Sequence, residues 1–87
     1  MASKHGIELN RAQRLLLREG RLLLGLTLGG VGQTVGVSDA AILRYEQGKS
    51  RPSAAVLEKW AKALGYEVVW GEMEIWPISK AKRAKRK

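Results

Sequence analysis

The sequence contains no cysteine and no phenylalanine, and its 87 residues include one histidine and two prolines. Without cysteine the chain forms no disulfide and no thiolate metal site, and His5 alone does not make a zinc site. No carboxylate pair stands on an obvious rigid face, and no phosphate-binding loop ending in Gly-Lys-Ser or Gly-Lys-Thr is present. We therefore expect no catalytic residue, no metal and no cofactor, and a protein that is not an enzyme.

Long hydrophobic runs are also missing. The longest are the leucine triplets at 15–17 and 22–24, far short of the roughly 20 residues that span a bilayer. The first residues lack the apolar core of a signal peptide. We expect a soluble, cytoplasmic protein with no membrane partner. The length predicts one small domain with a tail.

Positive charge is in excess. Lysine and arginine number 16 against 8 acidic residues, a formal net charge of +8. Residues 56–78 are net acidic, whereas residues 1–55 and 79–87 are basic. This distribution favours an anionic partner, nucleic acid rather than membrane, although a solvated surface with a disordered tail is the alternative. The basic residues of the predicted tail are Lys80, Lys82, Arg83, Lys85, Arg86 and Lys87.

Apolar periodicity predicts four helices. In the first, over residues 8–24, the spacing places Leu9, Ala12, Leu15, Leu16, Leu22 and Leu23 on one face and Arg11, Arg14, Arg18 and Arg21 on the other. Three shorter helices are expected at about 28–35, 39–47 and 54–64. They begin after Thr27, Ser38 and Ser53 and end at Gly36, Gly48 and Gly65.

After residue 65 the pattern changes to alternation. Residues 66–70 and 73–76 are predicted to form two strands joined by a two-residue type II′ turn at Gly71-Glu72. Two arrangements remain open for this apolar segment: it joins two copies in a homodimer, or it folds back over the bundle. Trp60, Trp70 and Trp76 are expected to be core or interface anchors rather than base-stacking platforms.

The second and third predicted helices fit a helix-turn-helix. Gly32 is small where the helices cross, and Gly36 tolerates the positive φ of the turn. Apolar residues that would lock the pair onto the domain are Val31, Val35, Val37, Ile42 and Tyr45.

A family resemblance rests on five segments. These are Gly25-Leu26-Thr27, Val35-Gly36-Val37-Ser38, Ile42-Leu43-Arg44-Tyr45-Glu46-Gln47-Gly48-Lys49, Arg51-Pro52 and Trp60-Ala61-Lys62-Ala63-Leu64-Gly65, with Leu57 between the last two. They resemble the phage repressor and Cro-like (XRE-type) helix-turn-helix family over about residues 10–66. The resemblance implies a mainly α fold, a compact four- or five-helix bundle, here followed by a β-hairpin and a basic tail. It also implies double-stranded DNA binding through the helix that starts at Ser38.

Geometry and the resemblance assign roles to particular residues. Outward-facing residues near the start of a recognition helix meet base edges, and here these are Ser38, Asp39, Ala40, Leu43 and Arg44. Arg44 suits a guanine edge, whereas Asp39 either accepts from cytosine or caps the helix. Phosphate contacts are expected from Thr27, Gln33, Lys49, Ser50 and Arg51. The family pattern implies an ion pair between Arg21 and Glu46.

The chain departs from the family where the second helix starts. Leu28 replaces a phosphate-binding glutamine, and Gly29 and Gly30 replace polar residues. The predicted organisation is a flexible N-terminus (1–7), a helix-turn-helix domain (8–65), a strand or hairpin (66–78) and a tail (79–87).

The expected function is a Cro/repressor-type regulator of phage or prophage origin, a homodimer that occupies operator DNA in the bacterial cytoplasm. An antitoxin that binds a toxin protein and autoregulates its operon is the alternative. A nonspecific architectural or RNA-binding protein driven by the tail is a third reading.

Overall fold

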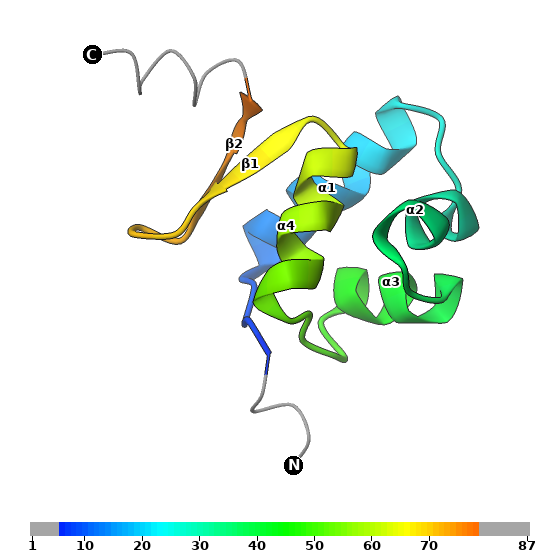
Figure 1. Cartoon of the computed structure of the whole chain (residues 1–87), viewed down its shortest axis with the longest axis horizontal. Helices are drawn as coiled ribbons and strands as arrows, with labels where there is room; N and C mark the ends of the chain where they lie inside the picture. Colours follow the sequence, from blue (N-terminus) through cyan, green and yellow to red (C-terminus); the bar gives the residue numbers. More distant parts are fainter. Residues whose placement is uncertain (1–5, 79–87) are drawn as a thin grey trace.

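The computed structural model describes residues 6–78, which form a helical bundle followed by a hairpin (Figure 1). The elements in this range are α1 (Arg11–Leu23), α2 (Leu28–Val35), α3 (Asp39–Gln47), α4 (Ala54–Ala63), β1 (Tyr66–Val69) and β2 (Glu74–Pro77). The predicted mainly α fold class is therefore confirmed. No helix within residues 6–78 is long and apolar enough to cross a membrane.

The helix boundaries follow local sequence chemistry. The hydroxyls of Thr27, Ser38 and Ser53 each accept a backbone N–H in the first turn of α2, α3 and α4, which satisfies a donor that the helix leaves unpaired. These three predicted caps are confirmed. α1 starts later than predicted because Asn10 and Gln13 exchange hydrogen bonds of 2.8 and 2.9 Å in a capping box.

The predicted hydrophobic face of α1 is largely wrong. Leu15, Leu22 and Leu23 are 40%, 52% and 86% exposed. The buried residues of α1 are instead Leu17, Gly20 and Arg21. Two tertiary contacts select this face: the ion pair that Arg21 makes and the approach of a tyrosine ring to Gly20. The apolar periodicity of a single helix gives no information about either contact.

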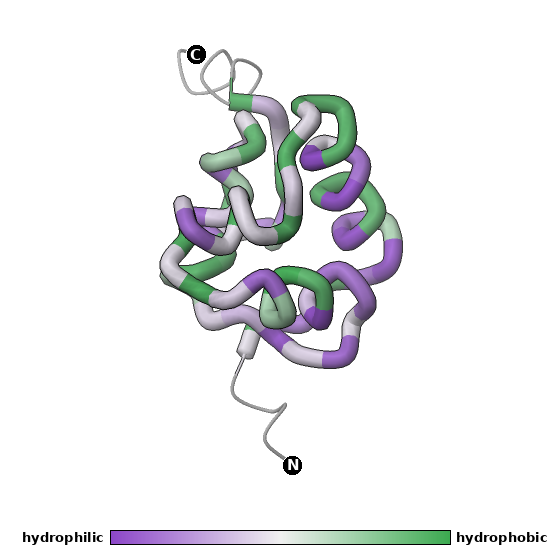
Figure 2. Tube along the Cα trace, turned by 90° about the vertical axis from the view of Figure 1, so that its right-hand side faces the viewer, coloured by the Kyte–Doolittle hydropathy of each residue, from purple (hydrophilic) through white to green (hydrophobic). Residues whose placement is uncertain are grey.

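The core is centred on α4. Leu57 and Trp60 of this helix are fully buried together with Leu17, Val31 and Ile42 from the other three helices. Hydrophobic and hydrophilic stretches follow one another along the trace of each helix, as expected for amphipathic helices around a shared core (Figure 2). The prediction that Trp60 is a core anchor is confirmed.

The hairpin connection differs from the predicted type II′ turn. The antiparallel register pairs Val69 with Glu74, so four residues, 70–73, connect the strands. The positive φ falls on Met73, at 52°, and not on Gly71. The reason is tertiary: the Met73 carbonyl accepts a 2.9 Å hydrogen bond from Gln13 Nε2 of α1.

The hairpin folds back on the bundle. Val68 is buried in the core cluster, and Tyr66 and Ile75 pack against it. A Cβ added to Gly20 would lie 3.0 Å from Tyr66 Cε2, so the ring sits directly on α1. In Figure 1 the hairpin lies on the side of α4 away from α2 and α3. It therefore leaves the helix-turn-helix uncovered.

Candidate nucleic-acid interface

α2 and α3 form a tightly joined helical pair. The Gly32 carbonyl accepts hydrogen bonds from Gly36 N at 2.7 Å and Val37 N at 2.9 Å. A Cβ on Gly32 would lie 2.5 Å from the Val37 carbonyl oxygen, and Gly36 has a φ of 93°. The predicted roles of both glycines are confirmed, because one position requires close backbone approach and the other a left-handed conformation.

The inner side of this pair is held by apolar side chains. Val31, Val35 and Ile42 are buried, and Val37 and Tyr45 pack partly buried against the same core. The Tyr45 ring meets Trp60 of α4 with ring centroids 5.7 Å apart. These contacts fix which side of α3 faces the protein and which faces solvent.

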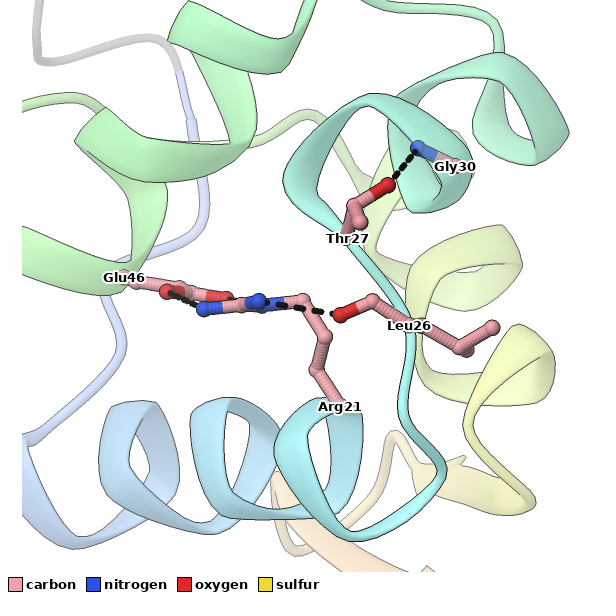
Figure 3. Close-up of polar contacts among 5 residues, drawn as sticks. All are labelled: Arg21, Leu26, Thr27, Gly30 and Glu46. Atoms are coloured by element: carbon pink, nitrogen blue, oxygen red, sulfur yellow. Dashed lines mark hydrogen bonds and ion pairs between the residues drawn. The ribbon is translucent and has the colours of Figure 1, made fainter.

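Arg21 and Glu46 form a buried ion pair that connects α1 to α3. Arg21 Nε donates to Glu46 Oε2 at 2.8 Å and Arg21 Nη2 to Glu46 Oε1 at 3.2 Å, while Nη1 donates to the Leu26 carbonyl at 3.1 Å (Figure 3). The side chains are 10% and 2% exposed. The pair implied by the family pattern is present, and it fixes the end of α3 relative to α1 and the start of α2.

The five predicted base-reading residues all lie at the start or on the outer side of α3 and are exposed: Ser38, Asp39, Ala40, Leu43 and Arg44. Two of them have local partners. Ser38 Oγ caps the helix by accepting from Ala41 N at 3.0 Å, and Asp39 Oδ1 accepts from Ala40 N at 2.7 Å. Arg44 makes no ion pair or side-chain hydrogen bond within residues 6–78.

The predicted phosphate-binding residues lie in two places. Thr27 and Gln33 are exposed at the start and outer side of α2, and Lys49, Ser50 and Arg51 follow the end of α3. The Thr27 hydroxyl oxygen accepts from Gly30 N at 2.9 Å (Figure 3), which leaves its O–H available to donate. The predicted basic tail, 79–87, and residues 1–5 lie outside the described residues.

Sequence reasoning missed Arg14 as a candidate binding residue. It was placed on the arginine face of α1 without a binding role, yet it is half-buried and lines a hollow of about 270 Å³ beside Lys49, Ser50 and Arg51. The signal that was available is its spacing of seven residues from Arg21, which puts both on the same side of α1. Ile7, assigned to the N-terminal segment, closes one side of this hollow and donates to the Pro52 carbonyl at 2.7 Å.

The outer surface of α3 carries groups that can bind a ligand. Within residues 6–78 no group of three or more histidine or acidic side chains is placed to hold a metal ion. The outer face of α3 instead presents a guanidinium, small side chains and a leucine, beside a basic loop.

Comparisons with known proteins point the same way. A family model described as helix-turn-helix matches residues 17–71. The chain is 41% identical over 54 residues to an uncharacterized HTH-type transcriptional regulator of Methanothermobacter thermautotrophicus, an alignment that covers 62% of this chain and 78% of that protein. No solved structure matches the chain.

Proposed function

This chain belongs to the Cro-like, XRE-type helix-turn-helix family of DNA-binding transcriptional regulators, and we propose that it recognises a specific operator in double-stranded DNA through α3. One observation carries the proposal. The inner side of α3 is fixed by Ile42 and by the Glu46 ion pair, while its outer side presents Leu43 and Arg44 to solvent. A helix held in this way can enter the major groove as a rigid body.

The proposed division of labour separates base reading from backbone binding. Arg44 donates two hydrogen bonds to O6 and N7 of a guanine, and Ala40 and Leu43 contact thymine methyl groups. Asp39 acts as a cap. Backbone phosphates are bound by Thr27, Gln33, Lys49, Ser50 and Arg51, with the tail residues 80–87 adding nonspecific attraction. The proposed mode of regulation is that of a Cro protein or phage repressor, in which the bound protein blocks access to a promoter. The proposed location is the cytoplasm.

Replacing Arg44 with alanine is expected to weaken operator binding by about 1–3 kcal/mol, because one bidentate guanine contact is lost. The preference at one G·C pair per half-site should relax at the same time. Competition binding against operators altered at single base pairs measures both quantities.

Lys49→Ala is the matched control, since it removes the same charge from a proposed phosphate contact. It should weaken binding to all sequences alike and reduce the salt slope by about 0.9. Uniform weakening by Arg44→Ala would place that guanidinium on the backbone and reject its base-reading role.

We also propose that the regulator binds as a homodimer, because one helix-turn-helix reads few base pairs and two-fold pairs read half-sites roughly 34 Å apart. The hairpin is the proposed contact. Within residues 6–78, β1 and β2 form a two-stranded sheet, so each has one edge outside this pairing, and such edges favour further strand pairing. Sedimentation of the free protein at micromolar concentration should give a dimer. A monomeric intact chain would reject this contact.

An antitoxin is the second candidate function. The observation that favours it is apolar surface at the end of α1, where Leu22, Leu23 and Leu24 are all more than half exposed. Patches of this kind mark protein partners. A complex with a small toxin encoded beside this gene, formed without loss of DNA binding and abolished by Leu23→Asp, would support it.

A further inference from the structure

The hollow at the end of α3 lies apart from the base-reading start of the helix. Three parts of the chain line it: residues 7–9 before α1, Arg14 within α1, and the segment that runs from Tyr45 and Gly48 to Pro52. Its volume is about 270 Å³. A Cβ on Gly6 would overlap Arg51 Cβ, so the N-terminal segment passes directly over the loop and closes the hollow from that side.

Arg14 forms the inner wall of this hollow. A Cβ placed on Gly48 would lie 2.7 Å from Arg14 Nη1 and 2.9 Å from its Cζ, so the guanidinium rests on the bare glycine that ends α3. Gly48 has a φ of 77°, so the position favours glycine for the turn and for this contact.

The Arg14 guanidinium has an unmet requirement. Its Nε is buried and has no hydrogen-bond partner, and Arg14 makes no ion pair within residues 6–78. Arg21, about two turns further along the same side of α1, has a buried carboxylate and a carbonyl as partners. A buried N–H of a cation without an acceptor is costly. The contrast leaves the Arg14 guanidinium available to an anionic ligand.

The surrounding charges favour the same kind of ligand. Lys49 and Arg51 add two cations and Ser50 adds a hydroxyl, all within the lining. The carboxylate among the lining residues is Glu8, whose side chain is 76% exposed and lies 3.3 Å from Arg51 Nη2. Three cations against one carboxylate leave the hollow positive.

We propose that this hollow binds one phosphate group, with Arg14 as its inner donor and Lys49 and Arg51 at its rim. The inference rests on the proposed function, and it adds a residue of α1 to the DNA-binding surface. The phosphate is a backbone phosphodiester of the bound duplex. Because Arg14 rests on Gly48, the bound phosphate anchors the end of α3 and so fixes how the helix lies in the groove. Glu8 competes for Arg51 until the phosphate replaces it.

The test measures operator affinity of the full chain as a function of salt for Arg14→Gln and for Arg18→Gln. Arg18 is an exposed arginine of the same helix outside the hollow, so the control carries the same change of charge. Arg14→Gln should weaken operator binding about tenfold and lower the salt slope by about 0.9, whereas Arg18→Gln stays within about twofold. Thermal unfolding of both variants monitors the fold.

A second arm locates the phosphate. Neutral methylphosphonate is placed at each backbone position of the operator in turn. At one position per half-site the change should weaken binding of the unaltered protein about tenfold and weaken binding of Arg14→Gln by a clearly smaller factor, because one of the three cations at that phosphate is already lost. Glu8→Gln, which leaves Arg14 in place, should strengthen binding about twofold by releasing Arg51. This opposite sign keeps the inference testable even if Arg14→Gln loses stability.

The results separate this inference from the proposed function. If the unaltered protein selects an operator while folded Arg14→Gln retains its full affinity and salt slope, the phosphate site is wrong and the function stands. If the protein prefers no sequence, the proposed function fails. Binding of inorganic phosphate can be followed by the NMR signal of Arg14 Nε–H. If this binding saturates at micromolar concentration and Arg14→Gln has unchanged DNA affinity, the hollow binds free phosphate and the backbone assignment is wrong.

Discussion

Replacing Glu46 with alanine is expected to lower the free energy of unfolding by about 3–5 kcal/mol. The substitution leaves the Arg21 guanidinium buried with the Leu26 carbonyl as its one remaining partner within residues 6–78. A buried cation that loses its carboxylate keeps its desolvation cost without the attraction that offset it. This is a large part of the roughly 5–15 kcal/mol that stabilises a typical domain. Denaturant unfolding followed by circular dichroism measures the change.

Two variants show whether the effect arises from the buried charge. Glu8→Ala breaks the exposed ion pair with Arg51 and should cost no more than about 1 kcal/mol. Combining Arg21→Met with Glu46→Leu removes both charges and should recover most of the stability lost by Glu46→Ala. A cost below about 1 kcal/mol for Glu46→Ala would mean that Arg21 reaches water, and the description of α1 and α3 as joined by this pair would be wrong.

Replacing Trp60 with alanine is expected to lower the free energy of unfolding by about 3–5 kcal/mol, because it opens a large cavity in a fully buried site. Trp60 is also the ring against which Tyr45 of α3 packs. Loss of Trp60 therefore removes the support behind the recognition helix as well as stability. Denaturant unfolding and operator binding at a temperature where the variant remains folded measure the two effects separately.

Trp70→Ala is the control of equal size change. Trp70 is 40% exposed and its Nε1 donates to Glu58 Oε2 at 3.1 Å on the surface. Its removal should cost less than about 1.5 kcal/mol and leave operator affinity unchanged. Equal costs for the two tryptophans would contradict the placement of the core around α4.

The local features of the fold were readable from the sequence. Ser38 and Ser53 were predicted as caps because a hydroxyl before a helix has one nearby backbone N–H to satisfy, a property of four consecutive residues. Gly36 was predicted in the turn for a similarly local reason, its freedom at positive φ. The helix-turn-helix therefore follows from short-range rules together with a family pattern.

The features that the sequence did not predict depend on contacts between distant residues. The buried face of α1 is selected by Glu46, 25 residues beyond Arg21, so counting leucines in one helix gave the wrong side. The hairpin connection is set by Gln13, 60 residues before Met73. Arg14 was given no binding role because its neighbour Gly48 lies beside it only in the folded chain.

The central claim is that the exposed side of α3 reads a defined DNA sequence. Selection of bound molecules from random duplex DNA by the full chain tests it most directly. We expect one enriched motif, with a G·C pair that Arg44→Ala no longer selects and two-fold related halves about one helical turn apart. Enrichment of no motif, with binding that depends only on salt, would contradict the account and indicate nonspecific electrostatic binding.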